Sequence, residues 1–405
     1  MFKKLFRILV KIISVIFLFI LLILFPYTIT PVYQFPEPKP FTGEKLYNPY
    51  SNTDFATWQR INFHAHSSYW GNIGITNANQ NSPENIYKAY HDELGYTMPG
   101  VSDYQHINYT LDTMPAFIAS YEHGFNIDRV HQLPVNAKRV TWLDYPLTQG
   151  LNQKQHVINA LHRQSDFVIL AHPNLDNGYL PEEVAKLTQF QAVEILNTFN
   201  YWGQAQEQWD AALSAGNYVL AVGDDDLHDL GKYGEFGYRF SSVGTESKKS
   251  EDLLRELKKG NHLIVGINRE SGDNLSIKKQ KLKGVEQRIT SFTVTEDSIT
   301  VTVDYPTHYI CFIGQNGTIL SKESGVKELT YIMQPGDAYA RAEIHYKDHT
   351  NVYMNPVARY SEEAPTKHNS AKVNILITII YIALRISIWL ALFSILLIKV
   401  IIRWR

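Results

Sequence analysis

The stretch RINFHAHSSY, Arg60–Tyr69, is an alternating apolar segment that runs into two histidines. His64 and His66 are separated by one alanine, so in an extended strand both imidazoles point to the same face and can reach one metal ion. A single pair of this kind is more often part of ordinary packing or of a surface. Whether this pair binds a metal ion therefore depends on which side chains the neighbouring strands place beside it.

Strand-like and helix-like runs alternate from about residue 59 to residue 270. SPENIYKAYHDELGY predicts a helix with Ser82 as its N-cap and Pro83 in its first turn, and FVILAHP predicts a buried strand. Strands that alternate with helices favour parallel pairing, either as a barrel or as a doubly wound sheet.

The predicted strands of this region end in imidazoles or carboxylates. In a parallel barrel such ends converge on one face, where active sites lie. Imidazoles together with carboxylates suit Zn²⁺, Mn²⁺ or Fe²⁺, and a carboxylate can bridge two ions. Glu194 also ends a strand, but we assign it no role. The predicted metal ligands are His64, His66, Asp103, Glu122, His131, His172, Asp226 and His228.

In this order, the segments FHAHSS, VSDYQH, ASYEHG, RVHQL, LAHP and GDDDLHD resemble the motifs of the polymerase-and-histidinol-phosphatase (PHP) superfamily. The likeness spans roughly residues 59–270. It implies a distorted seven-stranded (β/α) barrel that hydrolyses a phosphoester by means of a metal-bridging hydroxide.

The resemblance also implies how the ligands are shared. His64, His66 and Asp226 would bind a first ion. Glu122 would bridge to a second ion that His131 and His172 hold. Asp103 and His228 would belong to the remaining position or support the hydroxide.

The chain departs from the family pattern after Asp103, where Tyr104 replaces the usual histidine. We therefore expect two divalent ions, Mn, Zn or Fe, rather than three. Asp103, His106 or His228 would transfer the proton. Arg129, Lys232 and Arg239 flank the motifs and are candidate phosphate-binding residues.

Two alternatives to a phosphoesterase remain open. Amidohydrolases also use a His-x-His pair, later histidines and an aspartate, although their last motif is usually a lone aspartate. Tyr104 is compatible with a metal-binding scaffold that has no activity. The single cysteine, Cys311, excludes an internal disulfide.

Both ends of the chain are strongly apolar, and each stretch is long enough to span a bilayer. Lys3, Lys4, Arg7 and Lys11 at one end, and Lys399, Arg403 and Arg405 at the other, predict that both termini are cytoplasmic and that the region between them is extracytoplasmic. Arg385 lies within the second stretch and suggests a helix–helix partner. The predicted organisation is an anchor at 1–30, a linker at 31–58, the barrel at 59–270, an antiparallel β-domain at 272–360, a linker at 361–372 and a second transmembrane helix at 373–402.

The partners that we expect follow from the anchors and the charge. A net charge of −2 gives no reason to expect nucleic acid. The substrate would be a phosphorylated small molecule or a phosphorylated envelope component near the membrane.

Overall fold

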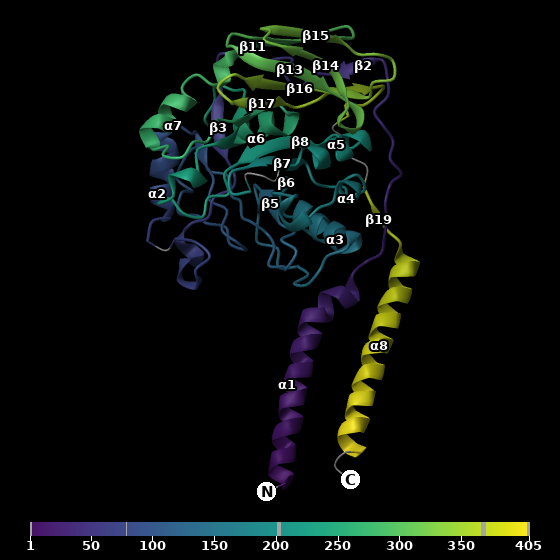
Figure 1. Ribbon diagram of the computed structural model, residues 1–405. Helices are drawn as coiled ribbons and strands as arrows, with labels where there is room; N and C mark the ends of the chain where they lie inside the picture. The colour runs from purple at the N-terminus through teal and green to yellow at the C-terminus, as the bar shows by residue number, and fades with distance from the viewer. Residues whose placement is uncertain (1, 78, 201–203, 366–369, 403–405) are drawn as a thin grey trace.

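The computed structural model describes residues 2–77, 79–200, 204–365 and 370–402. It shows a mixed α/β globular part at one end of two long helices, α1 (Phe2–Ile29) and α8 (Ile375–Ile402) (Figure 1). Arg403 and Arg405, which contribute to the predicted orientation, lie outside the described residues.

The largest sheet among the described residues has ten strands. Its main path is β14–β13–β16–β17–β10–β9–β3–β4, and β18 pairs with both β16 and β2. These strands are β2 (Lys45–Tyr47), β3 (Gln59–Asn62), β4 (Met98–Pro99), β9 (Arg239–Val243), β10 (His262–Gly266), β13 (Thr307–Ile313), β14 (Ile319–Ser324), β16 (Tyr339–Tyr346), β17 (Asn351–Met354) and β18 (Val357–Tyr360).

A second sheet carries much of the predicted site. It has the order β5–β6–β7–β8, with β5 antiparallel to β6 and the other neighbours parallel. The expectation of parallel pairing thus holds for part of the fold, since β9 is antiparallel to both β3 and β10. The strands are β5 (Gln132–Val135), β6 (Phe167–Leu170), β7 (Ala192–Asn197) and β8 (Leu220–Asp224).

The expected closed barrel is not found among the described residues. Isolated bridges connect the two sheets instead, between Ala65 and Leu227 and between Tyr104 and Glu122, both in parallel orientation. The predicted strand FIASYE forms only such bridges. Gly124, which follows this segment, has a φ of 128° that favours glycine.

The segment predicted as a separate β-domain shares the large sheet with the barrel region. Leu263 in β10 lies opposite Met354 in β17, so the ladder continues from one part to the other. Only three strands of this segment form a sheet of their own, in the order β11 (Ile289–Thr295), β12 (Ser298–Val303) and β15 (Glu328–Ile332).

A buried ion pair reinforces the junction between these two parts. Arg341 on β16 donates from Nε and Nη2 to the two oxygens of Asp210, each at 2.7 Å. Asp210 belongs to α5 (Gln206–Ser214) of the predicted barrel region. The β-rich segment is therefore tied to the rest both by its backbone and by side chains.

Short helices cover the sheets, and their ends follow the sequence. Ser82 caps α2 by accepting from the Asn85 N–H, with Pro83 in the first turn. α6 buries its leucines on one face and ends at Gly260, whose φ is 83°. The helices are α2 (Pro83–Tyr87), which continues as a π-helix over Lys88–Glu93, α3 (Leu151–His162), α4 (Pro181–Val184), α6 (Ser250–Lys259) and α7 (Leu275–Leu282).

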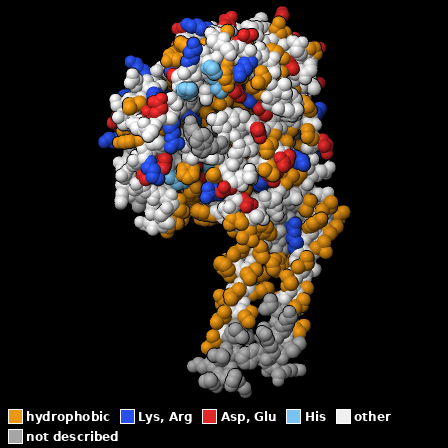
Figure 2. Space-filling model, in the orientation of Figure 1, with side chains coloured by type: hydrophobic (Ala, Val, Ile, Leu, Met, Phe, Trp, Pro, Cys, Tyr) orange, Lys and Arg blue, Asp and Glu red, His pale blue; other side chains and the backbone are white. Residues whose placement is uncertain are grey.

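The two terminal helices are each long and apolar enough to cross a membrane, over Lys11–Ile29 and Ile375–Ile395. Their described side chains are largely hydrophobic and exposed, in contrast to the mixed surface of the globular part (Figure 2). Arg385 on α8 donates to the carbonyls of Thr28 and Thr30 at the end of α1, at 3.4 and 3.0 Å. The costly charge within the second apolar stretch therefore has its partners in the same chain. The short strands β1 (Tyr33–Gln34) and β19 (Lys372–Val373) pair above them.

Candidate metal centre

The first histidine pair is fixed by the backbone of the last acidic motif. The N–H of Asp226 donates to the carbonyl of His64, and the N–H of His66 donates to the carbonyl of Leu227, both at 2.9 Å. The end of β3 and the segment after β8 are thereby held together, so residues some 160 positions apart present their side chains to one point.

His64, His66, Asp226 and Glu122 form a first ligand group that is entirely buried. The Nε2 atoms of His64 and His66 lie 3.2 and 3.3 Å from Oδ1 of Asp226. The same two nitrogens lie 3.4 and 3.0 Å from Oε2 of Glu122.

Glu122 also belongs to a second ligand group. Its other oxygen, Oε1, lies 2.7 Å from Nδ1 of His131 and 3.1 Å from Nε2 of His172. Each oxygen of Glu122 thus faces a different pair of imidazoles, which is the arrangement expected of a carboxylate that bridges two cations.

The donor atoms of both groups fit a metal ion. Within each group they lie within 4.8 Å of one another. A buried polar atom without a partner is costly and rare, yet several of these atoms are buried and make no hydrogen bond. A divalent cation would satisfy their lone pairs. The unpartnered atoms are Nε2 of His64, Nε2 of His66, Oε2 of Glu122, Nδ1 of His131 and Oδ1 of Asp226.

Glu194 supports this centre, a role that the sequence did not reveal. Its Oε1 lies 3.0 Å from Nδ1 of His64, and its Oε2 accepts from the His172 N–H at 2.5 Å. A proton on Nδ1 of His64 leaves Nε2 free as a ligand, so Glu194 orients the ring and fixes its tautomer. Its position within β7, a strand of the sheet that carries much of the site, was the available signal.

The pKa values reflect this crowding of charges. Burial lowers the pKa of His64, but the surrounding carboxylates outweigh burial and raise the pKa well above its usual value. The pKa of His66 rises to about 9 for the same reasons. Burial raises the pKa of Glu122, but the imidazoles hold it well below its usual value. Because the raised pKa values of His64 and His66 favour their protonated forms, a cation that binds these two rings would compete with protons.

The three consecutive aspartates have different structural roles. Asp224 accepts from the Phe63 N–H, and Asp226 joins the ligands. Asp225 is turned away from the ligands. It accepts from Oη of Tyr90, Oγ1 of Thr198 and the N–H groups of residues 237–239.

A cavity of about 490 Å³ opens onto the cluster. His228 and Arg129 line it, as does Tyr104. The Tyr104 ring stacks on His66 with centroids 4.5 Å apart. Tyr104, at which the sequence departs from the motifs it resembles, therefore covers part of the cluster.

Not every predicted site residue joins the cluster. Asp103 accepts from the N–H and Oγ of Ser67, each at 2.7 Å, and from Asn108. His106 stacks on Tyr69 instead, with ring centroids 3.8 Å apart.

The structure does not bring Lys232 or Arg239 to the cavity. The Lys232 side chain is 65% exposed and pairs with Glu235. Arg239 is buried and donates to the carbonyls of Tyr238 and Ile267.

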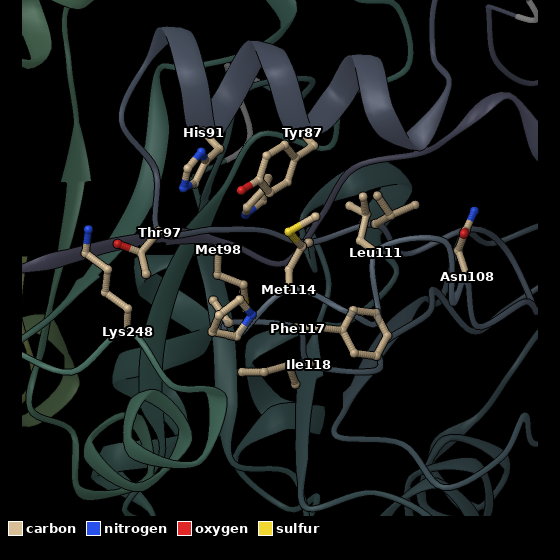
Figure 3. A pocket seen from close by; sticks show the side chains of 15 residues that line it. Tyr87, His91, Thr97, Met98, Asn108, Leu111, Met114, Phe117, Ile118 and Lys248 are labelled. Atoms are coloured by element: carbon tan, nitrogen blue, oxygen red, sulfur yellow. The ribbon is translucent and has the colours of Figure 1, made fainter.

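A smaller apolar cavity of about 110 Å³ lies elsewhere, beside β4 (Figure 3). Met98, Met114, Phe117 and Ile118 contribute to its wall, and none of the clustered histidines does. Asn108 at its edge links it to Asp103.

No protein-family model, no curated protein and no solved structure matches the chain.

Proposed function

We propose that the protein is a membrane-anchored phosphoesterase with a PHP-like barrel and two divalent cations, Mn, Zn or Fe. The observation that carries the proposal is the division of Glu122 between two imidazole pairs. The isolated bridges that link the two sheets fit a distorted barrel. Both termini would be cytoplasmic and the globular part extracytoplasmic.

The cations would be held by His64, His66, Asp226 and Glu122 in one position and by Glu122, His131 and His172 in the other. Bound divalent cations lower the pKa of a coordinated water and neutralise charge on phosphate oxygens.

The chain's own residues provide the remaining chemistry. Arg129 on the cavity wall is suited to bind a phosphate oxygen. Nδ1 of His228 lies 2.9 Å from the carbonyl of Asp226, so in the neutral ring Nδ1 donates and Nε2 is free to accept the proton of the attacking water. The water oxygen would bond to phosphorus as the ester P–O bond breaks, and the protonated His228 would return its proton to the leaving alcohol.

Metal analysis of the full chain in detergent, combined with a panel of phosphoesters, amides and lactones, tests the proposal. The double variant His64→Ala/His66→Ala should lose bound metal and at least about 10²-fold in kcat. His91→Ala is the matched control, because His91 is partly exposed, pairs with Asp92 and stacks on Tyr87, and belongs to neither ligand group. Intact phosphatase turnover in the double variant would contradict the mechanism.

One observation favours the alternative of a metal-binding scaffold that has no activity. The Tyr104 ring stacks on His66 and narrows the approach to the metal ligands, which a scaffold would tolerate because it does not need to admit a substrate. Stoichiometric metal with no turnover of any ester, amide or lactone would support this alternative.

A further inference from the structure

Four large apolar side chains are exposed on two neighbouring loop segments, and we call them the apolar rim. Phe125 and Ile127 are 45% and 65% exposed on one segment, and Trp142 and Leu147 are 72% and 42% exposed on the other. Exposed apolar residues that are grouped in this way commonly mark an interaction surface.

The two segments of the apolar rim are joined by hydrogen bonds. The N–H of Phe125 donates to the carboxylate of Asp144 at 2.6 Å, and the N–H of Ile127 donates to the carbonyl of Pro146 at 3.2 Å. Phe125, Ile127 and Pro146 also line the cavity above the metal ligands. Phe125 and Ile127 of the apolar rim therefore form part of the cavity wall, whereas Trp142 and Leu147 lie outside it.

The apolar rim also contacts the end of the first apolar helix. The N–H of Leu147 donates to Oη of Tyr27 at 2.7 Å, and the rings of Tyr27 and Tyr145 pack edge to face at 5.0 Å. Tyr27 lies near the end of the apolar span Lys11–Ile29. Tyrosines at such positions lie at the membrane–water interface.

The position of the globular part relative to α1 agrees with an apolar rim that lies near the membrane–water interface. The segment between β5 and α3 lies on the side of the globular part that faces α1, whereas β11 and β15 lie at the opposite end (Figure 1). A bilayer that surrounds α1 and α8 would therefore have its surface beside the apolar rim.

We infer that the apolar rim rests on the bilayer and that the substrate is a phosphoester carried by a membrane lipid. The lipid headgroup would enter the cavity beside the rim, where Arg129 complements the negative phosphate, while the apolar tail remains in the membrane. Hydrolysis would release the phosphoryl group into water and leave an alcohol on the lipid. This assignment of the substrate rests on the proposed function, whereas the contact with the bilayer does not.

The contact is tested with a nitroxide spin label on the full chain in phosphatidylcholine nanodiscs. Ile127→Cys carries the label at the rim, and Ile332→Cys, 60% exposed on β15, is the matched control. Cys311 is buried, and the unmodified chain controls for its labelling. Oxygen should broaden the signal at 127 more than a water-soluble nickel chelate does, with the reverse at 332. A water-like response at both positions would overturn the contact.

The substrate class is tested with two phosphomonoesters, soluble 4-nitrophenyl phosphate and phosphatidic acid in the same nanodiscs. Trp142→Ser should lower kcat/KM for phosphatidic acid about tenfold and leave 4-nitrophenyl phosphate turnover unchanged, because Trp142 does not line the cavity. Ile332→Ser is the matched control. Turnover of the soluble ester alone, or an equal loss for both esters, would overturn the substrate class and leave the phosphoesterase standing. Turnover of neither would overturn the proposed function itself.

Discussion

Glu122 offers the sharpest test of the metal centre, because one side chain belongs to both ligand groups. Replacement by glutamine keeps the size of the side chain but removes its charge and one of its two acceptor oxygens. We expect Glu122→Gln to weaken both positions at once. His131→Ala should affect only the second.

The expected magnitudes follow from the number of remaining ligands. Without Glu122, the first position retains His64, His66 and Asp226, whereas the second retains only two imidazoles. Loss of an outer hydrogen-bond partner typically costs 10–100-fold in metal affinity, so loss of a direct ligand should cost about 100-fold or more. Bound metal should therefore fall from about two ions per chain to one or fewer in Glu122→Gln, and to about one in His131→Ala.

The assay is metal analysis after dialysis against a weak chelator, with isothermal titration for the affinities. Asp103→Asn is the control, because the Asp103 carboxylate accepts hydrogen bonds from Ser67 and Asn108 and belongs to neither ligand group. This variant should retain the metal content of the unmodified chain. The idea of a shared carboxylate would be refuted by two ions in Glu122→Gln, or by loss of both ions in His131→Ala. Three ions in the unmodified chain would contradict a two-metal centre.

Three further predictions concern other parts of the molecule. Glu194→Gln should weaken metal affinity about 10–100-fold without removing a ligand, measured by the same titration, because Glu194 orients His64. Burial lowers the pKa of His262 from 6.5 to about 4, so the unfolded state binds an extra proton between these values, and stability is lost as the pH falls through that window. His262→Gln should remove this contribution, about 1.4 kcal/mol per pH unit, from the pH dependence of the free energy of unfolding, measured by denaturant titration in detergent; an unchanged slope would be the contrary result. Arg341→Ala should lower the free energy of unfolding by about 3–5 kcal/mol in the same assay, since it leaves the buried Asp210 carboxylate unpaired, and a loss under about 1 kcal/mol would contradict this account.

The sequence was most informative where strands end. His64 and His66 follow β3, His172 follows β6, and Asp226 follows β8, and the structure brings all four together with Glu122. This succeeded because the direction of a strand determines at which edge of a sheet the next side chain emerges. That rule depends on local pattern and needs no knowledge of distant contacts.

The sequence could not predict features that depend on long-range partners. Asp103 and Asp226 both follow predicted strands. The Asp103 carboxylate, however, accepts hydrogen bonds from Ser67 and does not join the metal ligands. The pairing of β10 with β17 was missed for the same reason, since a change from helix-rich to strand-rich sequence suggests a new domain and carries no information about register. The two sheets are linked by isolated bridges, such as that between Ala65 and Leu227, and such bridges leave no periodic pattern in the sequence.

The continuous ten-stranded sheet has a consequence for biogenesis. β10 can pair with β17 only after β17 has been synthesised, and β17 lies shortly before α8, the second apolar helix, in the sequence. Until then the nascent chain exposes an open strand edge that could pair with a neighbouring polypeptide. The globular part can therefore complete its large sheet only at about the time α8 is synthesised, which couples the folding of the globular part to the appearance of the second apolar helix.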